Sequence, residues 1–117
     1  MSNTLEKTPL TRLCHCDDIE SQGARGFDLA EQALFVVRRF DRFYIYRNRC
    51  PHLGLRLEWM PNRFLDSDNE LIQCATHGAL FIIESGECVA GPCQGATLQA
   101  LDFEIKDGWI YVDISEA

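Results

Sequence analysis

Two short segments of the chain each combine a cysteine, a histidine and a following glycine. Cys50 and His52 belong to the segment CPHLG, and Cys74 and His77 belong to the segment CATHG. Cysteine thiolates and histidine imidazoles are the side chains that hold zinc and iron in many proteins. A single cysteine or histidine is most often a buried structural residue, but four of them in two matched segments predict a metal site.

The spacing inside each segment favours a shared direction for its two ligand types. An extended backbone points Cys50 and His52, two positions apart, to the same side, and a turn does the same for Cys74 and His77. The glycine that follows each pair permits the tight, left-handed backbone that such a loop needs. Two loop tips brought together would therefore present two thiolates and two imidazoles.

Strands must position these loops, because the flanking residues are β-branched and aromatic. Residues 33–40 (ALFVVRRF) and 43–48 (FYIYRN) predict a hairpin that turns at Asp41-Arg42, with CPHLG directly after its second strand. The strands ELIQC and ALFII flank CATHG, and Asp107-Gly108 predicts a last hairpin within residues 101–114. No stretch of a dozen residues has helical periodicity, and residues 57–70, interrupted by Pro61, predict an irregular connection. The expected fold class is all-β.

Length and charge limit the classes of function. A chain of 117 residues that is 46% hydrophobic predicts one domain over residues 1–117. Its formal net charge of -7 argues against nucleic acid and favours a basic protein partner. No apolar run approaches the roughly 18 residues of a membrane span, and the start MSNTLEKTPLTR lacks the apolar core of a secretory signal. We therefore expect no membrane association and a cytoplasmic location, in which the six cysteines point to metal binding or catalysis rather than disulfides.

Two metal centres suit the four candidate ligands. Zinc with two cysteines and two histidines is chemically sound, but zinc fingers usually take both cysteines from one loop and both histidines from another element. Here each loop offers one ligand of each type. That interleaving suits a [2Fe-2S] cluster in which both cysteines hold one iron and both histidines hold the other.

At this point the chain resembles the Rieske ferredoxins and Rieske domains, whose signature is Cys-x-His followed, after a spacer, by Cys-x-x-His. RNRCPHLGLRLE is similar to the first cluster loop of the family, and LIQCATHGALFIIESGECVAGPC to the second loop with its Gly-Pro segment. LQALDFEIKDGWIYVDI is similar to the closing hairpin. The resemblance implies a sandwich of small antiparallel sheets with a two-loop cluster-binding subdomain. It also implies that Cys50 and Cys74 bind an inner iron, and His52 and His77 an outer one.

The chain departs from the high-potential members of this family at two places. Those members carry an extra cysteine in each loop, where this chain has Leu55 and either Ala75 or Thr76, so the disulfide between the loops cannot form. They also place a serine and a tyrosine, both donors to sulfur, where this chain has Ala79 and Phe81. The missing donors predict a potential towards the low end of the Rieske range of about -150 to +300 mV.

The functional interpretation follows from the resemblance and from the lack of any catalytic set in the sequence. We expect the protein to be an electron carrier rather than an enzyme, passing one electron from an NAD(P)H-dependent flavoprotein reductase to an acceptor such as a Rieske-type oxygenase. Two alternatives stay open: a structural zinc module for protein interaction, and a Rieske-like small subunit of a nitrite-reductase-type enzyme. The remaining cysteines are interpreted as structural: Cys14 and Cys16 of the motif CHC, expected in a first strand, and Cys88 and Cys93.

Overall fold

The computed structural model describes residues 10–29, 31–51, 56–58, 60, 62–75, 78–91 and 94–114. These residues form three small antiparallel sheets of three strands each, which confirms the all-β expectation. The sheets, in spatial order, are β1 (Thr11–His15), β9 (Trp109–Val112) and β8 (Phe103–Lys106); β2 (Gly23–Leu29), β3 (Gln32–Arg39) and β4 (Arg42–Arg47); and β5 (Leu71–Gln73), β6 (Leu80–Ile82) and β7 (Cys88–Ala90). The helical content of the described residues is one short 3-10 turn, η2 (Cys16–Asp18).

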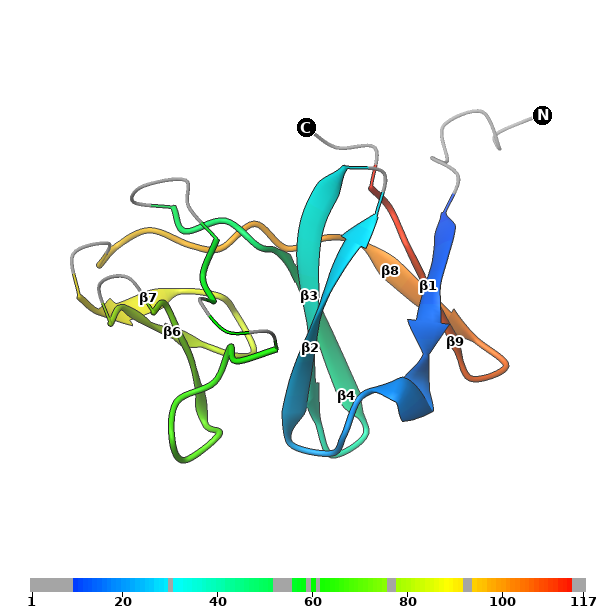
Figure 1. The fold of residues 1–117 in the computed structure, drawn as a ribbon, viewed down its shortest axis with the longest axis horizontal. Helices are drawn as coiled ribbons and strands as arrows, with labels where there is room; N and C mark the ends of the chain where they lie inside the picture. The colour runs from blue at the N-terminus through cyan, green and yellow to red at the C-terminus, as the bar shows by residue number, and fades with distance from the viewer. Residues whose placement is uncertain are drawn as a thin grey trace.

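The sheet β2-β3-β4 stands between the other two (Figure 1). The sheet β5-β6-β7 lies on one side of it, and the sheet formed by β1, β8 and β9 lies on the other. Strand β4 is also covered along its outer edge, because Arg47 and Leu101 donate backbone N–H groups to Gln99 and Ile45 across that edge. The molecule is therefore a row of three sheets, with a longest dimension of 47 Å.

Strand β3 is buried on both faces, which explains its unbroken apolar run LFVV. Successive side chains of a strand point to opposite faces. Accordingly, Leu34 and Val36 enter one hydrophobic cluster, together with side chains of β1 and β9. Phe35 and Val37 enter a second cluster, which contains both Cys50 and Cys74. Strand β3 thus contributes to both hydrophobic clusters, the one it shares with β1 and β9 and the one that contains the two cysteines.

The last hairpin, of β8 and β9, turns as predicted, and the turn between β3 and β4 differs from the prediction by one residue. Asp107 and Gly108 have φ values of +53° and +82°, as a tight two-residue turn between right-twisted strands requires. In the hairpin of β3 and β4, Arg39 pairs with Arg42, so the turn is Phe40-Asp41 and not Asp41-Arg42. The left-handed conformation of Phe40 is held from outside the hairpin, because its N–H donates to Gln22 Oε1 at 3.1 Å.

The connection between β4 and β5 is irregular where it is described, as the sequence predicts. It makes an isolated bridge between Leu65 and Ile72, and Gln73 donates its backbone N–H to the carbonyl of Phe64. Pro61, from which the irregularity was predicted, lies outside the described residues. Within the described part of the chain, no helix is long and apolar enough to cross a membrane.

Candidate metal centre

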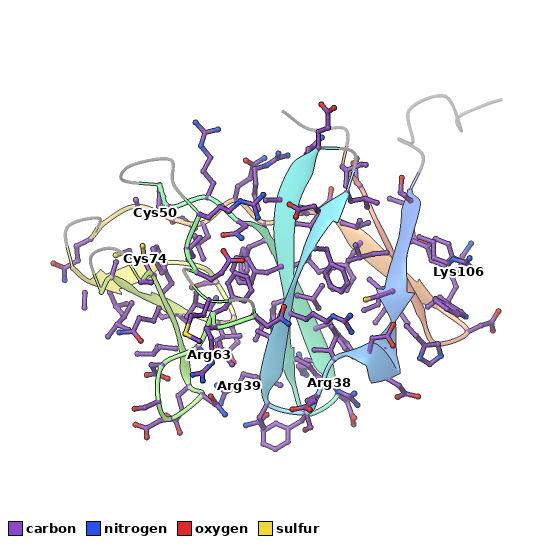
Figure 2. All side chains as sticks on the ribbon, in the orientation of Figure 1. Arg38, Arg39, Cys50, Arg63, Cys74 and Lys106 are labelled. Atoms are coloured by element: carbon purple, nitrogen blue, oxygen red, sulfur yellow. The ribbon has the colours of Figure 1, made fainter. Side chains whose placement is uncertain are left out.

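Cys50 and Cys74 lie at the same end of the molecule, although they come from different loops (Figure 2). Cys50 follows β4 and is 2% exposed, and Cys74 follows β5 and is fully buried. Both belong to the hydrophobic cluster between the middle sheet and the sheet β5-β6-β7. The structure therefore brings together the two cysteines that the sequence predicts as ligands.

The second loop is a tight turn with a glycine where one is needed. Gly78 donates its N–H to the carbonyl of Cys74 at 2.8 Å, and Cys74 donates its own N–H to the carbonyl of Ala79 at 2.8 Å. Gly78 has φ +68°, a conformation that side chains disfavour. These bonds fix the backbone on both sides of the turn and leave the Cys74 side chain facing the buried cluster.

The first loop is closed by a buried asparagine. Asn48 lies two residues before Cys50, and its side-chain oxygen accepts the backbone N–H of Leu57 at 2.8 Å. Its amide nitrogen donates to a Glu58 carboxylate oxygen, also at 2.8 Å. Leu57 then accepts the N–H of Ala75 on its carbonyl at 2.8 Å, which ties the first loop to the second. Sequence inspection missed Asn48 and Leu57, because their partners become neighbours only in the folded chain.

A third segment approaches the second loop at Gly91. Gly91 has φ +99°, and a Cβ atom added there would lie 2.8 Å from Ala79 Cα. The segment before it is braced by Cys88, whose sulfur donates to the carbonyl of Ala90 at 3.2 Å. Ala79 is itself fully buried. The Gly-Pro segment of the sequence therefore begins directly against the loop that carries Cys74.

The predicted histidine ligands His52 and His77 lie outside the described residues, as does Cys93. The described residues thus supply half of the predicted ligand set. Two buried thiols from separate loops in one hydrophobic cluster suit an iron–sulfur cluster, which cysteine thiolates hold through iron and whose potential depends on such burial. In this donor chemistry the described residues fit the predicted cofactor.

The residues of the motif CHC divide between two elements of the structure. Cys14 and His15 end β1, but Cys16 begins the turn η2 and so leaves the strand in which the sequence placed it. Burial raises the pKa of the Cys14 thiol from 9.0 to about 11, which disfavours the thiolate that a metal requires. Among the described residues, no three His, Cys, Asp or Glu side chains are grouped to hold a metal.

Comparison with known proteins agrees with this geometry. The chain is 28% identical to the ferredoxin CarAc of Metapseudomonas resinovorans over 102 residues, which is 86% of this chain and 90% of that protein. Its fold is similar to the ferredoxin of carbazole 1,9a-dioxygenase from Nocardioides aromaticivorans IC177, with a TM-score of 0.73 and 24% identity over 90% of this chain and 97% of the other. It is also similar to a chain in a complex of reduced oxygenase and oxidized ferredoxin in carbazole 1,9a-dioxygenase, with a TM-score of 0.75 and 24% identity over 95% and 98% of the two chains.

The Rieske [2Fe-2S] domain matches residues 10–104, a span that contains both cysteine loops, strands β1 to β7 and the first two residues of β8. This match supports the iron–sulfur interpretation over the zinc alternative, because Rieske centres hold two irons with two cysteines and two histidines. The chain therefore belongs to the Rieske [2Fe-2S] domain family, and its cofactor is a Rieske-type [2Fe-2S] cluster.

Proposed function

We propose that this protein is a Rieske-type ferredoxin that accepts one electron from an NAD(P)H-dependent flavoprotein reductase and passes it to a Rieske-type oxygenase. The observation that carries the proposal is the similarity to a ferredoxin over 90% of that relative's length. The similarity to a chain in a complex of oxygenase and ferredoxin supports an oxygenase as the acceptor. We place the carrier in the cytoplasm and treat residues 1–117 as one domain, as the sequence predicts.

In the proposed ligand set, the two cysteines hold one iron and the two histidines hold the other. Cys50 and Cys74, both buried, bind the inner iron as thiolates. His52 and His77 bind the outer iron through their imidazoles. A bound cluster of this type takes up and releases a single electron without a change of ligands. The protein's own contribution is to hold the two thiols at one place and to keep them away from water.

Charge supports a transient encounter with a basic surface. The formal net charge is -7, and oppositely charged surfaces raise the rate of encounter more than they raise affinity. Electron-transfer contacts are small, so attraction between unlike charges is a suitable way to form them rapidly and release them afterwards.

The proposal is tested on protein purified without oxygen from iron-replete cells. We expect a red-brown protein with two irons and two labile sulfides per chain, and a reduced-state EPR signal with the low average g value of mixed histidine and cysteine ligation. The reduced protein should be reoxidised on stopped-flow mixing with a Rieske oxygenase, and reduced again by NAD(P)H with a flavoprotein reductase. Stoichiometric zinc without iron would exclude the cluster, and a reduced protein that no oxygenase reoxidises would exclude the proposed acceptor.

A further inference from the structure

Asn48 is a polar residue that is only 5% exposed. An amide is costly to bury unless its donors and acceptors are satisfied. The adjacent strand end accounts for its backbone, because Asn48 N–H donates to the carbonyl of Ala33 in β3 at 2.9 Å. Its side chain therefore has a purpose beyond completing the sheet.

The Asn48 side chain spans the loop that carries Cys50. Its oxygen accepts from Leu57 N–H and its nitrogen donates to Glu58, each at 2.8 Å, so it joins the residue before the loop to the residues after it. The amide group supplies both the acceptor for the backbone N–H and the donor for the carboxylate. An aspartate at this position would lack the donor, and a leucine would lack both.

The contact extends from the first loop to the second. Leu57 is fully buried, and its carbonyl accepts the N–H of Ala75, the residue next to Cys74. The path from the middle sheet to the second cysteine thus runs through Ala33, Asn48, Leu57 and Ala75, in four consecutive steps of contact or peptide bond. In this chain no disulfide can join the loops at Leu55, and this path connects them without a covalent bond.

We propose that Asn48 is a positioning residue for the cluster: by clamping the first loop to Glu58 and, through Leu57, to the second loop, it holds the Cys50 and Cys74 thiols in their binding arrangement before iron is bound. Metal binding must otherwise order two separate loops, and that ordering is subtracted from the binding free energy. Groups that orient ligands in this way govern metal retention and electronic properties, although they never contact the metal.

The pair Asn48 and Glu58 allows a test by exchange of donor and acceptor. Asn48→Asp removes the donor and places two carboxylates together. Glu58→Gln retains the acceptor for the Asn48 amide and serves as the matched control. The double variant Asn48→Asp/Glu58→Gln restores a donor–acceptor pair in the opposite direction and keeps the wild-type net charge.

The experiment measures three properties of each holoprotein: the rate of cluster loss to a chelator from the visible absorbance, the reduced-state EPR g values and the midpoint potential. We expect Asn48→Asp to lose its cluster about tenfold faster or more, as the loss of a part-buried hydrogen bond to a charged group implies. We also expect shifted or broadened g values in the cluster that remains. Glu58→Gln should be close to wild type in loss rate, and the double variant should recover most of the loss rate and the g values, with its potential close to wild type.

Two results would overturn the inference. One is an Asn48→Asp protein with the loss rate and g values of wild type. The other is a double variant that folds but recovers neither property, which would leave Asn48 with only a general role in packing. If Asn48→Asp alone yields no holoprotein, recovery or its absence in the double variant still decides. None of these measurements uses a reductase or an oxygenase, so they stand or fall separately from the proposed electron acceptor.

Discussion

At the residue scale, the site depends on what surrounds the sulfurs. Cys50 and Cys74 lie in an apolar cluster, and the fully buried Phe81 belongs to the same cluster. Ala79 adjoins Cys74 through a backbone hydrogen bond of 2.8 Å. Neither Ala79 nor Phe81 has a side-chain hydrogen-bond donor. Because a donor to sulfur favours the more negative reduced cluster, their apolar side chains predict a low midpoint potential.

We expect Ala79→Ser and Phe81→Tyr each to raise the midpoint potential, and the double variant to raise it further, towards the middle of the Rieske range of about -150 to +300 mV. Protein-film voltammetry measures this directly. Ala100→Ser, which adds the same hydroxyl at an exposed position, is the control and should leave the potential unchanged. A wild-type potential at the top of the range, or a double variant without an upward shift, would contradict the low-potential assignment.

At the scale of elements, the loop that carries Cys74 is packed from two sides. Leu57 holds it through Ala75 on one side, and Gly91, after β7, touches Ala79 on the other. Gly91 fits only because it has no side chain, since any Cβ would overlap Ala79. The end of β7 therefore contributes to the shape of the site without supplying a predicted ligand.

Gly91→Ala should destabilise the protein and speed cluster loss, through backbone strain of about 1–2 kcal/mol and overlap costing about 1–3 kcal/mol more. Gly95→Ala is a matched control, because Gly95 has φ +96° but no atom within 4 Å of an added Cβ. It should show the backbone strain alone. Thermal unfolding and chelator-driven cluster loss measure both variants, and equal effects would show that the contact with Ala79 is unimportant.

At the scale of the whole molecule, Tyr46 joins the middle sheet to the sheet β5-β6-β7. It lies in β4, is 2% exposed, and donates its hydroxyl to the carbonyl of Ile83 at 2.6 Å. Gly86 packs against its ring, where an added Cβ would lie 2.8 Å from Tyr46 Cε1. Burial, with smaller contributions from Glu84 and Tyr44, raises the pKa of Tyr46 from 10.0 to about 12.

This raised pKa predicts a loss of stability in alkali. Between pH 10 and about 12 the folded protein keeps the Tyr46 proton while the unfolded chain releases it, so the free energy of unfolding falls as pH rises through that window. Below pH 10, Tyr46→Phe should cost about 1 kcal/mol from the lost hydrogen bond. Above it, the variant should lose stability less steeply than wild type. Denaturant unfolding followed by circular dichroism at several pH values tests this, and parallel curves for the two proteins would refute it.

Features that depend on near neighbours in the chain can be predicted from the sequence. The turn at Asp107-Gly108 and the loop at Gly78 follow from local backbone preferences. The spacing of Cys50 and Cys74 identified two loops that the fold does bring together, while the histidine ligands His52 and His77 stay predictions.

Features whose partners are distant in sequence could not be predicted, because they depend on how the sheets pack. The turn between β3 and β4 lies one residue away from its predicted position, and it involves Gln22, whose side chain accepts the N–H of Phe40 from another turn. The path from Asn48 through Leu57 to Ala75 exists because the end of β4, the connection that follows it and the loop after β5 meet in the folded chain. A hydrogen bond requires its donor and acceptor at about 2.9 Å, and only the packing of the sheets brings these groups to that distance.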